Sequence, residues 1–97
     1  MPGRLSLTYT SGLILETIAG GVSYGFNIID HTGLPSGTVY PALRRLESAG
    51  LIESLWNREE AGRSGGPPRK HYRLTRAGRE RLNLLRERFP LLERMAK

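Results

Sequence analysis

The sequence predicts a mainly α-helical domain that carries one two-stranded β-hairpin. Three segments with apolar residues at helical spacing follow one another between residues 10 and 49, separated by short glycine-containing turns. Two segments of alternating apolar and polar residues come next, at 51–56 and 69–75, and a last helical pattern covers residues 77–97. Helices joined by a short turn and followed directly by a hairpin have the order of a winged helix-turn-helix. We therefore expect residues 1–76 to form that domain, with one further helix packed on it.

The first two predicted helices are short and end at glycines. The first covers residues 10–19 and carries a stripe of leucine and isoleucine before a pair of glycines. The second covers residues 24–31, where Ser23 is a suitable N-cap because its hydroxyl can accept a free backbone N–H of the first turn. Gly33 then begins the turn that leads to the third helix.

The third predicted helix is the most clearly delimited element. Ser36 is a suitable N-cap, and Gly50 is a suitable residue just after the end because glycine adopts the left-handed conformation without a steric penalty. Its apolar residues fall on one side at helical spacing: Val39, Ala42, Leu43 and Leu46.

The opposite side of this helix differs from an ordinary solvated face. It is formed by small residues, a proline and cationic or hydroxyl side chains: Gly37, Thr38, Tyr40, Pro41, Arg44, Arg45 and Ser48. Because few bulky side chains project from this face, the helix can enter a groove of DNA while hydroxyl and guanidinium groups contact phosphates and base edges. Pro41 also disfavours a helix interior, and a local rule broken without structural gain points to function. The alternative is a solvated helix of a small bundle.

The two predicted strands form a hairpin, or wing. Residues 58–68 are rich in glycine and charged residues and contain two adjacent prolines, so we expect a loop there. In the second strand Tyr72 and Leu74 lie on one face, and the basic residues at 69, 71 and 73 lie on the other.

Two separated blocks of the sequence resemble the PadR family of bacterial transcriptional regulators. The first block is SGTVYPALRRLE at 36–47 with GLI at 50–52 and Trp56, and the second is GPPRKHYRLT at 66–75 with Ala77 and Gly78. The resemblance implies a winged helix that binds double-stranded DNA as a homodimer on a near-palindromic operator and regulates transcription, most simply as a repressor. It also implies a small aromatic effector in or near the dimer interface. Trp56 would then mainly support the hairpin, with ligand stacking as the alternative.

We assign candidate DNA contacts to the helix and the wing. Three residues are assigned to the major-groove helix: Thr38, Tyr40 and Arg44. Two are assigned to phosphates near helix N-termini: Tyr24 and Ser36. Three are assigned to the wing, facing phosphates or the minor groove: Arg63, Arg69 and Lys70. The alternatives are a half-buried packing role for Tyr40 and simple solvation of each wing charge.

The last predicted helix, residues 77–97, carries apolar residues on two sides. One stripe comprises Leu82, Leu85, Phe89 and Leu92, and the other comprises Leu84, Leu91 and Met95. Because a peripheral helix of a small domain needs only one buried face, we expect one stripe to pack on its own domain and the other on a second chain. We assign dimerisation to the first stripe. Pro90 should kink or split the helix, and we expect no larger domain after it.

Composition limits the remaining functions. The net charge is +6 with a pI near 10.5, and residues 58–97 hold 12 of the 15 Lys and Arg, which favours a polyanionic partner. The chain has no cysteine and no apolar run of membrane-spanning length, so we expect a cytoplasmic protein without membrane contact. His31 and His71 are the only histidines and have no metal-ligand spacing, so we expect no enzyme, metal or cofactor. The rival function is a winged-helix module that docks an acidic protein or RNA.

Overall fold

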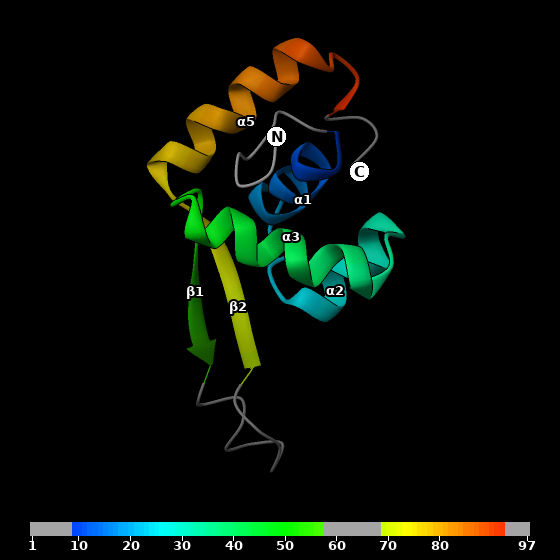
Figure 1. The fold of residues 1–97 in the computed structure, drawn as a ribbon, viewed down its shortest axis with the longest axis vertical. Coiled ribbons are helices and arrows are strands. Elements are labelled where there is room, and N and C mark those ends of the chain that lie inside the picture. The colour runs from blue at the N-terminus through cyan, green and yellow to red at the C-terminus, as the bar shows by residue number, and fades with distance from the viewer. Residues whose placement is uncertain (1–8, 58–68, 93–97) are drawn as a thin grey trace.

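The structure, a computed structural model, describes residues 9–57 and 69–92. Its elements follow in the order α1 (Tyr9–Ala19), α2 (Gly25–Thr32), α3 (Ser36–Ser48), β1 (Ile52–Asn57), β2 (Arg69–Leu74) and α5 (Arg76–Arg88). Helix α3 crosses the middle of the molecule, the hairpin extends away from it on one side, and α5 lies beyond its other side (Figure 1). The predicted winged helix-turn-helix is confirmed.

Helix α1 is the centre of the fold. Every residue from Ser11 to Ile18 is buried, including the polar residues Glu16 and Thr17. This differs from the one-sided stripe that the sequence indicates, because α2, α3, α5 and β2 all contact α1 and together surround it. The Thr17 hydroxyl donates to the Leu13 carbonyl at 2.7 Å, so this buried polar group is satisfied within the helix.

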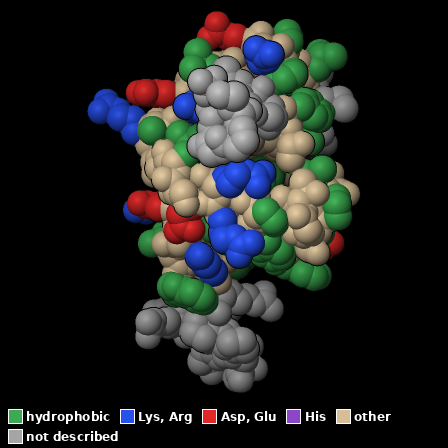
Figure 2. Space-filling model, in the orientation of Figure 1, with side chains coloured by type: hydrophobic (Ala, Val, Ile, Leu, Met, Phe, Trp, Pro, Cys, Tyr) green, Lys and Arg blue, Asp and Glu red, His purple; other side chains and the backbone are tan. Residues whose placement is uncertain are grey.

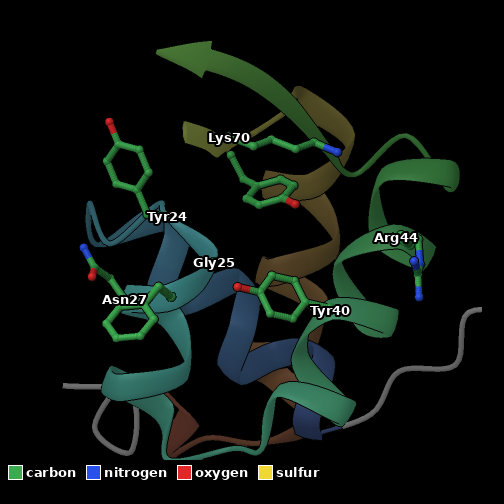
Figure 3. Close-up of a pocket in the computed structure, with 8 residues that line it drawn as sticks. Tyr24, Gly25, Asn27, Tyr40, Arg44 and Lys70 are labelled. Atoms are coloured by element: carbon green, nitrogen blue, oxygen red, sulfur yellow. The ribbon is translucent and has the colours of Figure 1, made fainter. Parts of the chain in front are cut away.

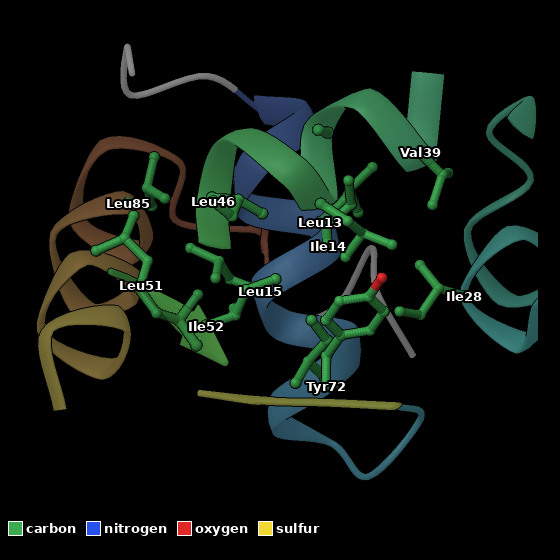
Figure 4. Packing of buried hydrophobic residues seen from close by; sticks show 14 of the residues in the cluster. Leu13, Ile14, Leu15, Ile28, Val39, Leu46, Leu51, Ile52, Tyr72 and Leu85 are labelled. Atoms are coloured by element: carbon green, nitrogen blue, oxygen red, sulfur yellow. The ribbon is translucent and has the colours of Figure 1, made fainter. Parts of the chain in front are cut away.

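All described elements contribute to one hydrophobic core, shown in Figure 4. Its largest fully buried aliphatic side chains are Ile14, Leu15, Ile28, Leu43, Leu46, Ile52, Leu82, Leu85 and Leu92. The hairpin adds Tyr72, whose ring is buried beneath α3 and beside α1. The wing is therefore anchored at its base by side chains that also hold the helices.

The junction between α3, β1 and α5 is closed by a threonine. After α3, Gly50 adopts a left-handed φ of 78°, as the sequence predicts. The Thr75 hydroxyl donates to the Gly50 carbonyl at 2.6 Å and accepts from the N–H of Gly78 at 3.0 Å, which caps α5. The end of α3 and the beginning of α5 are thus held by the same side chain.

The hairpin pairs antiparallel from Ile52↔Leu74 at its base to Asn57↔Arg69 at its far end. On the face toward α3, the Ser54 hydroxyl donates to a carboxylate oxygen of Glu47 at 2.6 Å. On the other face Arg73 forms an ion pair with Glu53. The wing is therefore fixed to α3 by a side-chain hydrogen bond as well as by the core.

Helix α5 is shorter than predicted and is tied to α1 by an ion pair. It ends at Arg88, two residues before Pro90, which confirms that the proline interrupts the helix. Nε and an Nη atom of Arg86 donate to the two carboxylate oxygens of Glu16 at 2.6 and 2.8 Å. The Glu16 side chain is only 6% exposed, and the bidentate guanidinium supplies both its charge partner and its hydrogen bonds. Residues 93–97 lie outside the described part.

The assignment of dimerisation to the first stripe of α5 is wrong in this structure. Leu82, Leu85 and Leu92 are at most 1% exposed and belong to the core of their own chain. Phe89 packs against that core with its ring edge-on to Tyr9, at a centroid distance of 5.6 Å. The pattern alone could not show which stripe the domain itself uses. The apolar residues that α5 and the turn after it leave exposed come from the second stripe: Leu84 at 52% and Leu91 at 58%.

Candidate nucleic-acid interface

The outer face of α3 is accessible, as predicted. Arg44, Arg45 and Ser48 are exposed, and nothing lies within 4 Å of a methyl group placed on Gly37. Thr38 is partly buried near the first turn. Figure 2 shows Lys and Arg side chains grouped on the face where α3 and the hairpin meet. A slim helix with cations along it can approach a duplex closely.

The first turn of α3 begins one residue earlier than predicted. Pro35 is the N-cap, in an extended conformation, and its carbonyl accepts the N–H groups of Thr38 and Val39 at 2.9 and 3.0 Å. Ser36 is the first helical residue and makes no capping bond, so the predicted N-cap role of Ser36 is wrong. Pro35 holds the N-cap position with φ −69° and ψ 153°. The Ser36 hydroxyl is left exposed beside the free N–H groups of the helix end, where anions are favoured.

Between α3, the beginning of α2 and β2 lies a pocket of about 640 Å³. It is lined by aromatic, amide and cationic side chains and one glycine: Tyr24, Gly25, Phe26, Asn27, Tyr40, Arg44, Lys70 and Tyr72 (Figure 3). Four of the predicted contacts meet here: Tyr24, Tyr40, Arg44 and Lys70. The other four lining residues could not be predicted, because they become neighbours only through the packing of α2 and β2.

Tyr40 extends from α3 across to the start of α2. A methyl group placed on Gly25 would lie 2.7 Å from the ring of Tyr40 and 3.2 Å from its hydroxyl oxygen. The absence of a side chain at Gly25 therefore allows the phenol to lie against α2, while 42% of Tyr40 stays exposed. Figure 3 shows its hydroxyl directed toward Gly25 and the pocket. The ring of Tyr40 packs against Gly25, which agrees with the packing role, and its hydroxyl stays accessible to a ligand, which is compatible with the DNA contact.

We expect Gly25→Ala to weaken DNA binding more than it affects folding. The new methyl group must displace the Tyr40 ring, which is free to rotate toward solvent, and the phenol then leaves the pocket. The expected loss is about 1 kcal/mol of binding free energy with a melting temperature within a few degrees of the parent. Fluorescence anisotropy of a labelled duplex and thermal denaturation measure the two quantities. Tyr40→Phe removes only the hydroxyl and leaves the ring in place, so it separates the effect of losing the hydroxyl from the effect of displacing the ring.

Lys70 and Glu47 set the charge on the wing side of the pocket. The Lys70 ammonium lies 3.6 Å from a carboxylate oxygen of Glu47 and 5.6 Å from the centroid of the Tyr72 ring. Burial raises the pKa of the Tyr72 phenol, and the nearby Glu47 and Tyr40 add to this rise while Arg44 opposes it. Tyr72 therefore stays neutral at physiological pH, and the charged residues of the pocket lining are Arg44 and Lys70, with Glu47 beside Lys70.

Tyr24 is positioned by the hairpin. It is the N-cap residue of α2, in place of the predicted Ser23, and its side chain makes no capping bond. It forms an isolated antiparallel bridge with His71, and the two rings lie 5.4 Å apart. The N–H of Tyr72 donates to the Ser23 carbonyl at 2.9 Å. The beginning of α2 thus extends the hairpin by one bridge, which the sequence did not indicate.

The remaining wing assignments are not placed by the structure. Arg63 lies outside the described residues, and Arg69 is described only as the first backbone position of β2. Among residues 9–57 and 69–92, no cluster of three His, Asp or Glu side chains could hold a metal ion. Within the same ranges no helix has the length and apolar character needed to cross a membrane.

Comparison with known proteins decides the family. The sequence pattern of the transcriptional regulator PadR-like family matches residues 14–84, which include α2, α3 and the hairpin. The chain belongs to this family. No curated protein matches it in the corresponding sequence comparison. A PadR-like chain is a DNA-binding transcription regulator rather than an enzyme, as the sequence predicts.

Solved structures agree with this assignment. A PadR family transcription regulator from Clostridium difficile is 32% identical over 90% of this chain and 93% of its own, with a TM-score of 0.74. A transcriptional regulator from Clostridium thermocellum is 28% identical over 89% and 84% of the two chains, with a TM-score of 0.72. A PadR-like transcription factor from Bacteroides fragilis is 28% identical over 87% and 82%, with a TM-score of 0.71. Each of these likenesses covers a larger share of this chain than the family pattern, which spans residues 14–84.

Proposed function

We propose that this PadR-like regulator binds a near-palindromic operator as a cytoplasmic homodimer and represses transcription. The single observation that carries the proposal is the pocket that joins α3, α2 and the wing on one accessible face with Arg44 and Lys70 in its lining. Release of DNA by a small aromatic effector belongs to the same proposal, and its support is the family resemblance.

Each element has a place on the duplex in this proposal. Helix α3 enters the major groove, where Thr38 and Arg44 face base edges. The hairpin lies over the adjacent minor groove, and the sugar-phosphate strand between the two grooves passes along the pocket. Tyr24, Tyr40 and Lys70 then contact this strand. In a two-fold dimer the two α3 helices enter successive major grooves about 34–36 Å apart.

The outer face of α3 also distinguishes this function from its rival. A helix that docks an acidic protein in a groove presents a row of large apolar anchors. In contrast, the outer face of α3 presents Gly37, Arg44 and Ser48. This composition favours the close approach of a nucleic acid duplex over a protein partner.

The test is a gel shift with the DNA upstream of the regulator's own gene at two salt concentrations. We expect specific binding that survives competition by unrelated duplex and weakens as salt rises, because phosphate contacts release counterions. Equal competition by operator and unrelated duplex would contradict sequence-specific binding. Binding to RNA or to an acidic protein in place of duplex DNA would support the rival function.

The apolar residues that α5 and the turn after it leave exposed form the proposed dimer surface. Leu84 and Leu91 are more than half exposed in the single chain, and burying the remaining surface of each contributes about 1–1.5 kcal/mol, half of the value for a fully exposed leucine. We therefore expect Leu84→Glu together with Leu91→Glu to shift the chain from dimer to monomer in light scattering at micromolar concentration. The circular dichroism spectrum should stay unchanged, because neither side chain belongs to the core. A parent chain that scatters as a 10.8 kDa particle would remove the dimer from the proposal.

A further inference from the structure

Trp56 is a large aromatic residue that the fold does not use. It is 58% exposed and lies outside the core cluster, although it belongs to a strand whose base is fully buried. The hairpin is held without it, by Ile52 and Tyr72 in the core and by the bond between Ser54 and Glu47. A supporting role for the hairpin therefore does not account for this tryptophan.

The register places Trp56 on the face of the hairpin that looks toward α3. It is paired directly with Lys70, and Ser54 is paired with Tyr72, so all four side chains lie on one face of the two strands. Tyr72 is buried in the core and Ser54 is bonded to Glu47 of α3, whereas the Trp56↔Lys70 pair lies two pairs farther out, where the hairpin extends beyond α3 (Figure 1). The indole thus continues the inner surface of the wing past the pocket.

Its neighbour Lys70 leaves the ring uncovered. The ammonium group of Lys70 lies over the Tyr72 ring and beside Glu47, that is, toward α3. The resulting surface combines a cation that can reach a phosphate with a broad apolar ring that carries one N–H donor. A sugar-phosphate strand offers the matching groups, because deoxyribose has an apolar face and its phosphates accept hydrogen bonds.

We propose that Trp56 packs its ring against a deoxyribose of the backbone strand that borders the minor groove, with Nε1–H donating to a phosphate oxygen. The inference rests on the proposed function and adds a contact to it. Because sugar and phosphate are the same at every step, the contact strengthens binding without selecting sequence. It also carries no charge, which separates it from the contacts of Arg44 and Lys70.

The first test uses the parent chain. Trp56 is the only tryptophan, so all tryptophan emission comes from the wing. We expect bound duplex to shift the emission and to lower the acrylamide quenching constant, because the covered ring is less accessible to a neutral quencher. Anisotropy of a dye on the same duplex records binding independently. Binding with unchanged quenching would overturn this inference alone, whereas no binding at all would overturn the proposed function and the inference with it.

The second test separates an apolar contact from an ionic one. Trp56→Ala should weaken binding to operator and to unrelated duplex alike by about tenfold, at the lower end of the loss of an aromatic contact with nucleic acid. The slope of log K against log salt should stay as in the parent, because no phosphate is neutralised by the indole. Trp56→Phe should restore part of the affinity. Asn83→Ala, at an exposed uncharged residue of α5 that belongs neither to the pocket nor to the proposed dimer surface, is the matched control and should leave the affinity as in the parent. An affinity for Trp56→Ala within twofold of the parent, or a loss confined to the operator, would overturn the proposal.

Discussion

Gly78→Ala is expected to destabilise the domain more than a Gly→Ala substitution at any other described glycine. A Cβ atom at this position would lie 1.9 Å from the carbonyl oxygen of Leu51, far inside van der Waals contact. The obstacle is backbone, and it is fixed: the Leu51 carbonyl accepts the N–H of Thr75 at 3.0 Å, and the Leu51 N–H donates to Leu46. Relief requires α5 to move away from the start of β1.

We expect this substitution to cost about 3–4 kcal/mol of unfolding free energy, at or above the upper end for an overpacked site. In a domain of this size such a loss lowers the melting temperature by more than about 12 °C. Thermal and urea denaturation followed by circular dichroism measure it. Gly37→Ala is the matched control, because its new methyl group meets nothing within 4 Å on an exposed helix face, and it should leave stability equal or slightly higher. Equal melting temperatures for the two variants would contradict the packing of α5 described here.

Arg44→Ala is expected to remove most of the discrimination between operator and unrelated DNA. Arg44 is exposed on the outer face of α3 and lines the pocket, so its guanidinium can reach a base edge from within the major groove. A bidentate contact to a guanine contributes about 1–3 kcal/mol of discrimination, which corresponds to roughly 5- to 150-fold in the ratio of the two affinities. Competition binding with operator and scrambled duplex at one salt concentration measures that ratio.

Lys70→Ala provides the comparison for Arg44→Ala. Lys70 lies on the wing side of the pocket, where a phosphate is the expected partner, so its loss should weaken binding to all duplexes about equally. The salt slope should also decrease by about 1, since one phosphate is no longer neutralised. If Arg44→Ala behaved in the same way and left sequence preference intact, the assignment of α3 to base recognition would be wrong.

The order of the elements could be predicted because each has its own periodicity and its own stop signals. Gly50 ends α3 and Pro90 interrupts α5, as local backbone chemistry requires. Helix starts were less accurate. Ser23 and Ser36 both precede or begin a helix and have the right hydroxyl, yet Tyr24 and Pro35 occupy the N-cap positions. N-cap propensity could not locate these starts, because Tyr24 and Pro35 occupy the N-cap positions without any side-chain capping bond.

The periodicity of the sequence could not predict which side chains from different elements pack together. The two stripes of α5 have similar composition, so periodicity could not show that Leu85 faces the core and Leu84 the solvent. The pocket was found only in part for the same reason. Gly25 is open to the Tyr40 ring because α2 and α3 pack closely there, and the only signal in the sequence was a glycine at the start of a helix.

The enclosure of α1 by α2, α3, α5 and β2, together with the Glu16–Arg86 ion pair, has a mechanical consequence. Within the described residues α3 and α5 both pack on α1, so in the proposed dimer we expect each protomer to bind DNA as one rigid unit. In a two-fold dimer joined through α5, the distance between the two α3 helices is then set by the dimer interface and not by flexibility within each protomer. One base pair inserted between the half-sites of the operator would rotate one half-site about the duplex axis. Only distortion of the dimer interface or of the DNA could then bring both half-sites back into contact with the two α3 helices.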